Sequence, residues 1–442
     1  MHLIWENLVK NLVLHWTNAF KGLGQGAGSY HIEKSVWDAI GAGAAASGST
    51  IPGSFGARPP NFAAEKMSST ADTWSFWTLY LAPIQLERTF ADKKYYDHFV
   101  ELVRLLHMCL QFEITRTEVE GIRQGFIAWV EKYEELYYQY NPDRVSACPL
   151  TIHALLHIAD MILVAGPVWA YWAYAMERYC GIIRPDIRSK KHPYASLDRG
   201  VLETAQLTQI GLLYNAQDCL QILNRRLSRP DRKGSMRVVG YNYTLLPPVS
   251  SNCADPSLIT RVKKALGTRY NLSRKPQVLK RLASSVIITQ YASVQVDSGD
   301  RIYAYSALTE TQRAERRDAT YVRYEVLVDQ RPRDMNEANA IFEKETFFGR
   351  VQHLLCVRVP SDPAAGVLEP ETILLAGITP CDISNKHDVL DIHVYKDESP
   401  TEELVDLNCV MCLVGRMRYR KRHWAIIDRS GTLARAVYEP DN

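Results

Sequence analysis

The stretch that decides how the chain is organised runs from Cys148 to Arg199 and reads CPLTIHALLHIADMILVAGPVWAYWAYAMERYCGIIRPDIRSKKHPYASLDR. Pro149 stands where a proline can open a helix, and Gly166-Pro167 interrupts the apolar run that follows. We therefore expect one helix before this turn and a second helix after it. The aromatic residues beside the turn, Trp169 and Trp172, predict that the two helices form a hairpin buried in the core.

An uncharged run of 16 residues, from Met161 to Met176, crosses this turn. A membrane-spanning helix needs about 20 apolar residues, and Gly166-Pro167 would break it. We therefore expect the run to lie in a protein core, and we predict no membrane partner.

Periodic apolar residues predict a mainly helical first half. The expected helices cover residues 2–21, 35–46, 70–81, 92–114, 118–140 and 149–164, then the stretch from the 166–167 turn to residue 180, and residues 197–227. Pro83 is expected to stop the third helix. The aromatic stripe from Phe126 to Tyr140 is expected to be core.

The last 160 residues have the alternation and the turn residues that are typical of strands. The expected strands cover residues 286–296, 347–359, 372–378, 390–395, 404–417 and 423–428. Several short strands with turns between them favour a small β-barrel or sandwich. The predicted fold class is therefore α+β and multi-domain, with a helical half, a basic linker at residues 236–283 and a C-terminal β-rich module.

Charge is distributed unevenly along the chain. Residues 1–177 hold 13 basic and 18 acidic side chains, residues 178–282 hold 20 and 6, and residues 283–442 hold 19 and 25, so the net charges are −5, +14 and −6. A segment this basic is typical of a surface that binds a polyanion, because lysines and arginines that neutralise phosphates release counterions. The alternative is a solvated basic linker.

The residues that we expect to contact DNA are lysines and arginines of the middle segment. They are Arg184, Arg188, Lys190, Lys191, Arg225, Arg226, Arg229, Arg232, Lys233, Lys263, Lys264, Arg274 and Lys275. Phosphate contacts carry no sequence information, so the predicted binding is electrostatic and non-specific. A separate cluster, Arg416 to Arg422, is expected to be either a nuclear-localisation patch or a charged hairpin tip.

Two residue pairs have a spacing that metal sites use. His153 and His157 share one helix face at i and i+4, but Ala154 stands where a zinc protease carries its glutamate. We therefore favour hydrogen-bonding roles for these histidines over metal binding. Cys409 and Cys412 form a C-x-x-C in a strand-like stretch, where residues i and i+3 point to opposite faces, so we expect structural cysteines there.

Three segments resemble CACTA-type (En/Spm) transposases. Residues 1–16, MHLIWENLVKNLVLHW, are similar to the D-x-M-H-L segment of that family, entered at its methionine. Residues 46–83, ASGSTIPGSFGARPPNFAAEKMSSTADTWSFWTLYLAP, are similar to fungal members. Residues 148–199 resemble the end of the nuclease domain and the start of a domain of unknown function. The likeness covers residues 1–235 and, more loosely, residues 345–430.

The resemblance implies the remnant of an RNase H-like nuclease, in which three carboxylates hold two Mg²⁺ ions for phosphodiester transfer. Glu177 matches the position of the third acid, and His2 matches the histidine of the D-x-M-H-L segment. The first two acids of the family lie upstream of the matched residues, and a single carboxylate cannot hold two metal ions. No cofactor is therefore expected for this chain alone. The alternative role for Glu177 is a local ion pair with Arg178.

The domains implied are a helical remnant of the nuclease region (1–147), a transposase-associated helical domain (148–235), the linker (236–283) and the β-rich module (284–442). The function implied is that of a truncated, non-catalytic protein that associates with DNA, or assembles with transposase chains or with itself, in the nucleus or alternatively the cytoplasm. The competing hypothesis is an endonuclease subunit that supplies Glu177, with the other two acids upstream or in trans. The third hypothesis is that the chain is the product of a decayed transposable element and has no selected function.

Overall fold

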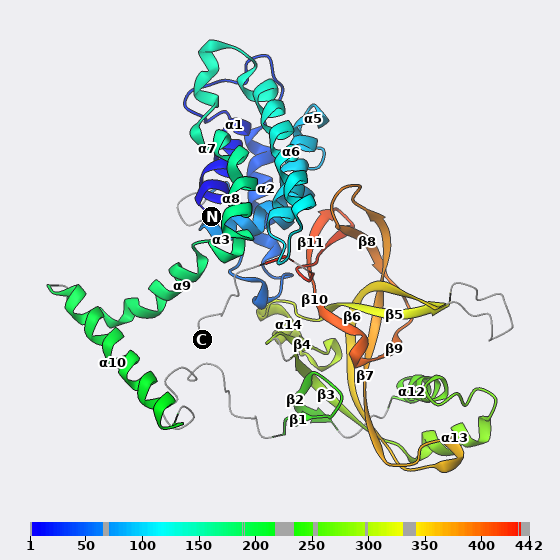
Figure 1. Ribbon diagram of the computed structural model, residues 1–442. Helices are drawn as coiled ribbons and strands as arrows, with labels where there is room; N and C mark the ends of the chain where they lie inside the picture. Colours follow the sequence, from blue (N-terminus) through cyan, green and yellow to red (C-terminus); the bar gives the residue numbers. More distant parts are fainter. Residues whose placement is uncertain are drawn as a thin grey trace.

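The computed structural model describes residues 2–64, 70–187, 189, 191–216, 234–250, 255–296, 299–329, 342–431 and 433–434. Its N-terminal half is helical, and its C-terminal half is built on a large antiparallel sheet (Figure 1). The predicted α+β class is therefore confirmed. The RNase H-like remnant and the small barrel or sandwich stay predictions.

The helical half consists of α-helices joined by short 3-10 and π-helical turns. The α-helices are α1 (Val9–Trp16), α2 (Lys34–Ser47), α3 (Ala71–Phe76), α4 (Ala82–Gln85), α5 (Lys93–Cys109), α6 (Arg116–Tyr133), α7 (Leu150–His153), α8 (Ile158–Ala165), α9 (Tyr174–Ile183) and α10 (Pro193–Leu213). The other turns are η1 (His2–Leu8), η2 (Gly53–Phe55), η3 (Trp77–Leu81), η4 (Glu134–Tyr138), η5 (Pro142–Ala147), η6 (Ala154–His157), η7 (Val168–Ala170) and η8 (Arg184–Asp186).

Helices α5 and α6 form the centre of the helical half. Thr115 caps α6 in a capping box, which satisfies backbone N–H groups at the start of the helix. Trp129 and Tyr137 of the predicted aromatic stripe are buried, whereas Tyr140 is exposed. His98 of α5 stacks on Trp129 with ring centres 4.3 Å apart, and burial lowers its pKa to about 4. The stripe is therefore core up to Tyr137.

The expected helix stop at Pro83 is wrong. Thr70 caps α3 by accepting a hydrogen bond from the backbone N–H of Thr73, and the helical path then continues through η3 into α4. Pro83 lies in the first turn of α4. A proline is tolerated there because first-turn N–H groups have no acceptor within their own helix.

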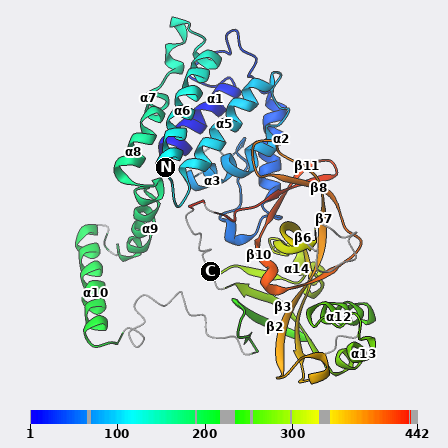
Figure 2. The ribbon, with the colours of Figure 1, turned by 45° about the vertical axis from the view of Figure 1, so that its right-hand side comes forward.

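The buried hairpin expected around Gly166-Pro167 is also wrong. α8 contributes Ala159 and Ile162 to the core, but Val164 and Trp169 are 84% and 39% exposed. α9 and α10 then leave the body of the molecule (Figures 1 and 2), and α10 buries only Gly211 among its described residues. Most of the described apolar side chains of this arm beyond Tyr174 therefore face solvent.

α10 begins before the expected helix at 197–227 and ends at Leu213, and residues 217–227 lie outside the described residues. Across the part of the chain that the structure describes, no single helix is long and apolar enough to cross a membrane. One bent pair, Leu150–Ala165 with Val168–Asp186, meets the length and composition required.

The sheet half holds twelve strands in its described residues. They are β1 (Met236–Arg237), β2 (Tyr243–Ser250), β3 (Ile287–Val296), β4 (Arg301–Tyr303), β5 (Tyr321–Asp329), β6 (Phe342–Val359), β7 (Glu371–Lys386), β8 (His393–Glu398), β9 (Glu403–Asp406), β10 (Val410–Leu413), β11 (Gly415–Arg420) and β12 (His423–Ile427). The main path is β1-β2-β3-β6-β7-β8-β12-β11, while β4 pairs with β3, β9 with β7, and β5 with both β6 and β10. The long strand β6 pairs with β5 along its first half and with β3 along its second.

The described residues of the expected basic linker, 236–250 and 255–283, are folded as part of the sheet half. β2 pairs with β3, and the helices α12 (Pro256–Arg269) and α13 (Pro276–Ser285) bury Leu258, Val262 and Leu282 in a core shared with β6 and β7. Strands β4 and β5 were likewise not expected. The short helix α14 (Glu310–Glu315) and the turns η9 (Tyr305–Ala307), η11 (Pro363–Ala365) and η12 (Leu407–Cys409) complete this half.

The two halves meet where the loop after α2 contacts β11. The Thr50 hydroxyl donates to the carbonyl of Arg416 at 2.5 Å, and the backbone N–H of Arg416 donates to the carbonyl of Thr50 at 3.0 Å. The guanidinium of Arg416 is largely buried and pairs with Asp318 at 2.7 Å. Arg416 is therefore structural, and the predicted localisation patch is reduced to Arg418–Arg422 at the β11–β12 turn.

Candidate nucleic-acid interface

Glu177, the predicted catalytic acid, lies on α9 with its side chain 52% exposed. Its Oε1 is 3.5 Å from Nε2 of His2, and Glu6 contacts the other ring nitrogen of this histidine. Within the described ranges, no three His, Cys, Asp or Glu side chains are grouped so that they could hold a metal ion. Glu177 therefore has one histidine beside it and no set of further ligands from the described part of this chain.

The histidine pair predicted as a weak metal candidate does come together. Nε2 of His153 and Nε2 of His157 are 3.1 Å apart, and both side chains are exposed. Asp160 lies about one helical turn after His157, where a carboxylate could add a third ligand, but it forms an ion pair with Arg123 at 2.7 Å. The pair is thus an exposed hydrogen-bonded contact, with its potential third ligand engaged elsewhere.

The predicted DNA contacts fall in separate places. Arg184 and Lys191 are exposed near the junction of α9 and α10. Arg188, Lys190 and the group Arg225, Arg226, Arg229, Arg232 and Lys233 lie outside the described residues. Lys263, Lys264, Arg274 and Lys275 belong to α12, α13 and the loop between them, on the opposite side of the molecule from α10 (Figure 2). The described residues therefore do not form one continuous basic surface.

We refer to residues 255–285, which comprise α12, α13 and their connection, as the basic hairpin. Asp255 caps α12 by accepting from the backbone N–H of Ser257. Leu258, Val262 and Leu266 repeat every four residues and are buried against the sheet. Gly267 lets the two helices approach, because a Cβ there would lie 3.1 Å from Cδ2 of Leu279.

Three arginines on the inner side of the basic hairpin pair with acids of the sheet half. Arg261 lies 3.2 Å from Glu402, Arg269 lies 2.9 Å from Asp406, and Arg281 lies 2.6 Å from Asp362. Hydrogen bonds from Arg281 lower the pKa of Asp362. Each of these partly exposed pairs contributes little stability by itself, but three at different points fix how the hairpin sits on the sheet.

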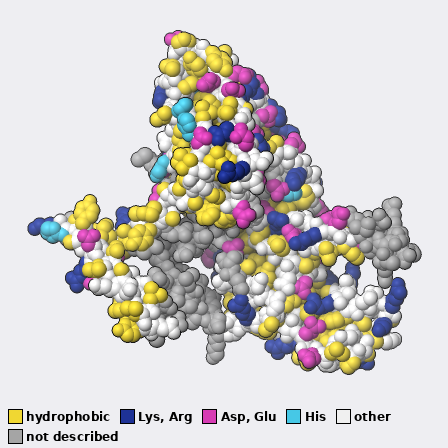
Figure 3. Space-filling view, viewed as in Figure 1, with side chains coloured by type: hydrophobic (Ala, Val, Ile, Leu, Met, Phe, Trp, Pro, Cys, Tyr) yellow, Lys and Arg dark blue, Asp and Glu magenta, His cyan; other side chains and the backbone are white. Residues whose placement is uncertain are grey.

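The remaining charge of the basic hairpin faces outward. It holds eight lysines and arginines and one acid, Asp255, so its net charge is +7. The five basic residues other than the inner arginines are Lys263, Lys264, Arg274, Lys275 and Lys280, and all but Lys263 are classed as exposed. Dark blue side chains mark this corner of the surface in Figure 3.

A groove of about 1060 Å³ lies beside the hairpin, between the β1–β2 turn, β5 and β9. Its charged lining is balanced: Arg237, Arg269 and Lys344 face Glu325, Glu371 and Asp406. Lys344 pairs with Glu325 and Arg269 with Asp406. The groove therefore lacks the excess positive charge that a phosphate backbone requires.

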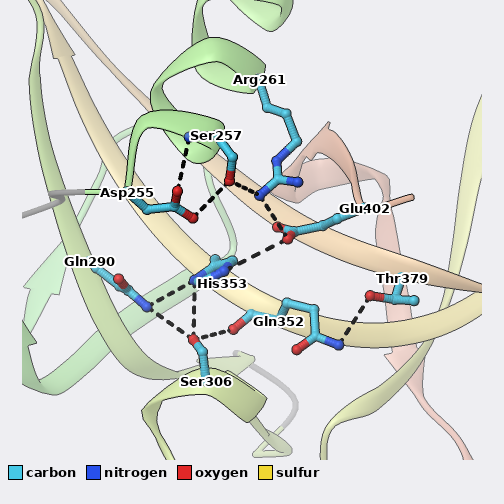
Figure 4. Close-up of polar contacts among 9 residues, drawn as sticks. All are labelled: Asp255, Ser257, Arg261, Gln290, Ser306, Gln352, His353, Thr379 and Glu402. Atoms are coloured by element: carbon cyan, nitrogen blue, oxygen red, sulfur yellow. Dashed lines mark hydrogen bonds and ion pairs between the residues drawn. The ribbon is translucent and has the colours of Figure 1, made fainter. Parts of the chain in front are cut away.

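A polar network lies beneath the N-terminus of α12 (Figure 4). Arg261 donates to Ser257 Oγ at 3.2 Å and pairs with Glu402, whose Oε2 is 3.7 Å from Nε2 of His353. Nδ1 of His353 contacts Ser306 Oγ at 3.1 Å. Burial lowers the pKa of His353 and raises the pKa of Glu402. The sequence contained no local signal for this network, because its members are far apart along the chain.

Cys409 and Cys412 are both half-buried free thiols. Cys409 ends η12 and Cys412 lies in β10, where its Sγ is 3.8 Å from Oδ1 of Asp428. Burial raises the pKa of Cys412 to about 12, so its thiolate is disfavoured.

No protein-family model, curated protein or solved structure matches this chain. The resemblance to transposases therefore rests on the sequence segments alone.

Proposed function

We propose that this chain is a transposase-derived protein that associates with DNA in the nucleus without cutting it, and that the basic hairpin is its contact surface. The observation that supports this is the net charge of +7 on two helices whose apolar faces and three arginines are turned toward the sheet. Helices held in this way present lysines to a DNA backbone in a fixed arrangement. A solvated linker would have to order itself on binding.

The size of the effect follows from how many phosphates the hairpin neutralises. Five phosphates, one for each outward basic residue, give a slope of about −4.5 in log affinity against log salt on duplex DNA. Between 50 and 200 mM salt, the affinity should therefore fall by about 500-fold. Sequence preference should be slight, because the lysines and arginines bind phosphate groups.

The test is fluorescence anisotropy with a labelled duplex of arbitrary sequence, using the full chain. The variant Lys263→Gln, Lys264→Gln, Lys275→Gln and Lys280→Gln removes four outward charges from the basic hairpin. We expect its salt slope to shrink by about 3.6, because each neutralised phosphate contributes about 0.9 to the slope.

The matched control changes four lysines elsewhere, Lys34, Lys93, Lys132 and Lys396, each of which pairs with a neighbouring acid. It alters the net charge by the same amount and should leave the slope unchanged. Equal reductions in the two variants would mean that the overall charge, and not the basic hairpin, governs binding.

The endonuclease-subunit hypothesis has one observation in its favour. Glu177 is exposed on α9 beside the exposed apolar residues Met176 and Tyr179, so another chain has access to its carboxylate. The isolated chain with Mg²⁺ should not nick DNA. Nicking that appears only when a chain carrying the other two acids is added, and that Glu177→Gln abolishes, would favour the subunit.

A further inference from the structure

Four separate parts of the sheet half bring polar side chains to one place on its surface (Figure 4). His353 comes from β6, Ser306 from η9, Gln290 from β3, and Glu402 from the residue before β9. In the pairing of β6 with β7, Val351 is opposite Ile378 but His353 is opposite Gly377, so Gln352 is the extra residue of a β-bulge. Such bulges redirect side chains and are frequent beside active sites.

Gly377 provides the space in which the acid and the histidine meet. A Cβ on this residue would lie 2.0 Å from Oε1 of Glu402 and 3.3 Å from the Cβ of His353. The side chain of Glu402 is only 11% exposed, and its Oε1 is buried without a hydrogen-bond partner. The carboxylate is therefore held beside the imidazole by the absence of a side chain at Gly377.

The contacts of His353 select one tautomer. Nε2 of the Gln290 amide lies 3.0 Å from Nδ1 of His353 and donates to it, so Nδ1 carries the lone pair. The ring proton is then on Nε2, which faces Oε2 of Glu402 at 3.7 Å. At 3.7 Å the carboxylate places a negative charge beside the second nitrogen of this base without a hydrogen bond to it.

Ser306 faces the lone pair of this imidazole. Its Oγ lies 3.1 Å from Nδ1 of His353 and 2.5 Å from the carbonyl oxygen of Gln352, so its single proton can be directed to either. Ser306 is exposed, and a reagent in solution can reach it. Burial and the charge of Arg261 lower the pKa of His353, which keeps the imidazole in its basic form at neutral pH.

We propose that Ser306, His353 and Glu402 form a hydrolytic site in which Ser306 is the nucleophile for small acyl esters. This activity is independent of DNA association. Ser306 Oγ bonds to the ester carbonyl carbon as its proton passes to Nδ1 of His353, and the bond to the leaving alcohol breaks as that oxygen takes the proton. Water then attacks the acyl-serine, His353 again carries the proton, and the carboxylic acid is released.

Two neighbours have defined roles in this step. Glu402 faces the Nε2 proton and stabilises the imidazolium that forms during transfer. Nε2 of Gln290 lies 3.1 Å from Ser306 Oγ and 3.0 Å from Nδ1 of His353, so its two N–H groups hold the hydroxyl and the base next to each other. Because Ser306 stands on a surface turn, the site suits short, uncharged acyl groups with a good leaving group.

The test is labelling of the intact protein with an alkyl fluorophosphonate, read by whole-protein mass and peptide mapping, together with hydrolysis of p-nitrophenyl acetate. We expect a single adduct on Ser306 and no hydrolysis by Ser306→Ala. His353→Gln places a polar amide at this position but removes the base, and it should slow labelling by about 100-fold or more. The labelling rate should fall only as the pH drops below 6.5, the usual value for histidine.

The control residue is Ser284, an exposed serine whose hydroxyl also donates to a backbone carbonyl, that of Lys280, at 2.9 Å. If the network only positions α12, Ser306 should be labelled no faster than Ser284, and His353→Gln should change nothing. Either result overturns the proposal. Peptide mapping of the labelled parent protein compares Ser306 with Ser284 directly, so the proposal is tested even if a variant fails to fold.

Discussion

Replacing Leu266 by alanine tests whether the basic hairpin rests on the sheet as a packed unit. Leu266 is fully buried between α12 and the sheet, in a core that includes Leu355 and Leu375. Truncation of such a leucine leaves a cavity and costs about 2–5 kcal/mol. A cost at the lower limit corresponds to about a 30-fold rise in the population of the opened hairpin, because 1.4 kcal/mol is a factor of about ten.

Hydrogen exchange read by mass spectrometry measures this opening directly. Peptides from residues 256–285 should lose protection in Leu266→Ala, while peptides from α5 and α6 should not change, because those helices belong to a different core. Leu368→Ala is the matched control, since that side chain is 79% exposed. If both variants exchange like the parent chain, α12 does not depend on the sheet, and the rigid DNA-binding surface proposed above is wrong.

Three other expectations concern stability. Trp129→Ala should lower the free energy of unfolding by about 3–5 kcal/mol, because this side chain is buried. Trp169 is 39% exposed, so Trp169→Ala should lower it by clearly less. Thermal unfolding of the two variants tests this difference. Gly377→Ala should destabilise the sheet half by about 1 kcal/mol or less, because its Cβ would meet the end of the Glu402 side chain, which can move aside, and a larger loss in denaturant unfolding would contradict that geometry. Arg281 lowers the pKa of Asp362, so their pairing stabilises the fold at a pH above the unfolded-state pKa of Asp. This stabilisation is lost as the pH falls through that value and below it. In Arg281→Gln, the unfolding temperature should therefore depend less on pH between about 5 and 2.

The helical half was predictable where an apolar stripe had a partner inside the chain. The stripe of α6 repeats at helical spacing, and the residues from Phe126 to Tyr137 pack as expected. The residues around Trp169 are equally apolar, yet Trp169 is 39% exposed and its neighbours Val168 and Trp172 are only partly buried against the core. Periodicity predicts that a helix forms, but it cannot say whether another element covers that helix. The hairpin prediction failed for this reason.

The basic segment shows the opposite error. Between Arg261 and Arg281, charged residues outnumber the buried leucines. The density of charge along this segment therefore predicts a solvated linker. In the fold, Arg261, Arg269 and Arg281 are matched by acids that lie 81 or more residues away in sequence. Those acids contribute to a net charge of −6 after residue 283. The basic and acidic segments therefore complement each other. Their opposite net charges are compatible with such pairing, but they do not identify which residues pair.

The Ser306, His353 and Glu402 site lay beyond sequence reasoning for a geometric reason. The three residues are about 50 positions apart, and each has an unremarkable local context. They meet because β6 pairs with β7 with one extra residue at Gln352, and because β9 pairs with β7 so that the chain before it passes Gly377. Shifting a strand by one residue turns its side chains to the other face of the sheet. Without the bulge, His353 would therefore not keep its present position opposite Gly377, so deleting Gln352 should abolish the reactivity of Ser306 even though all three chemical groups remain.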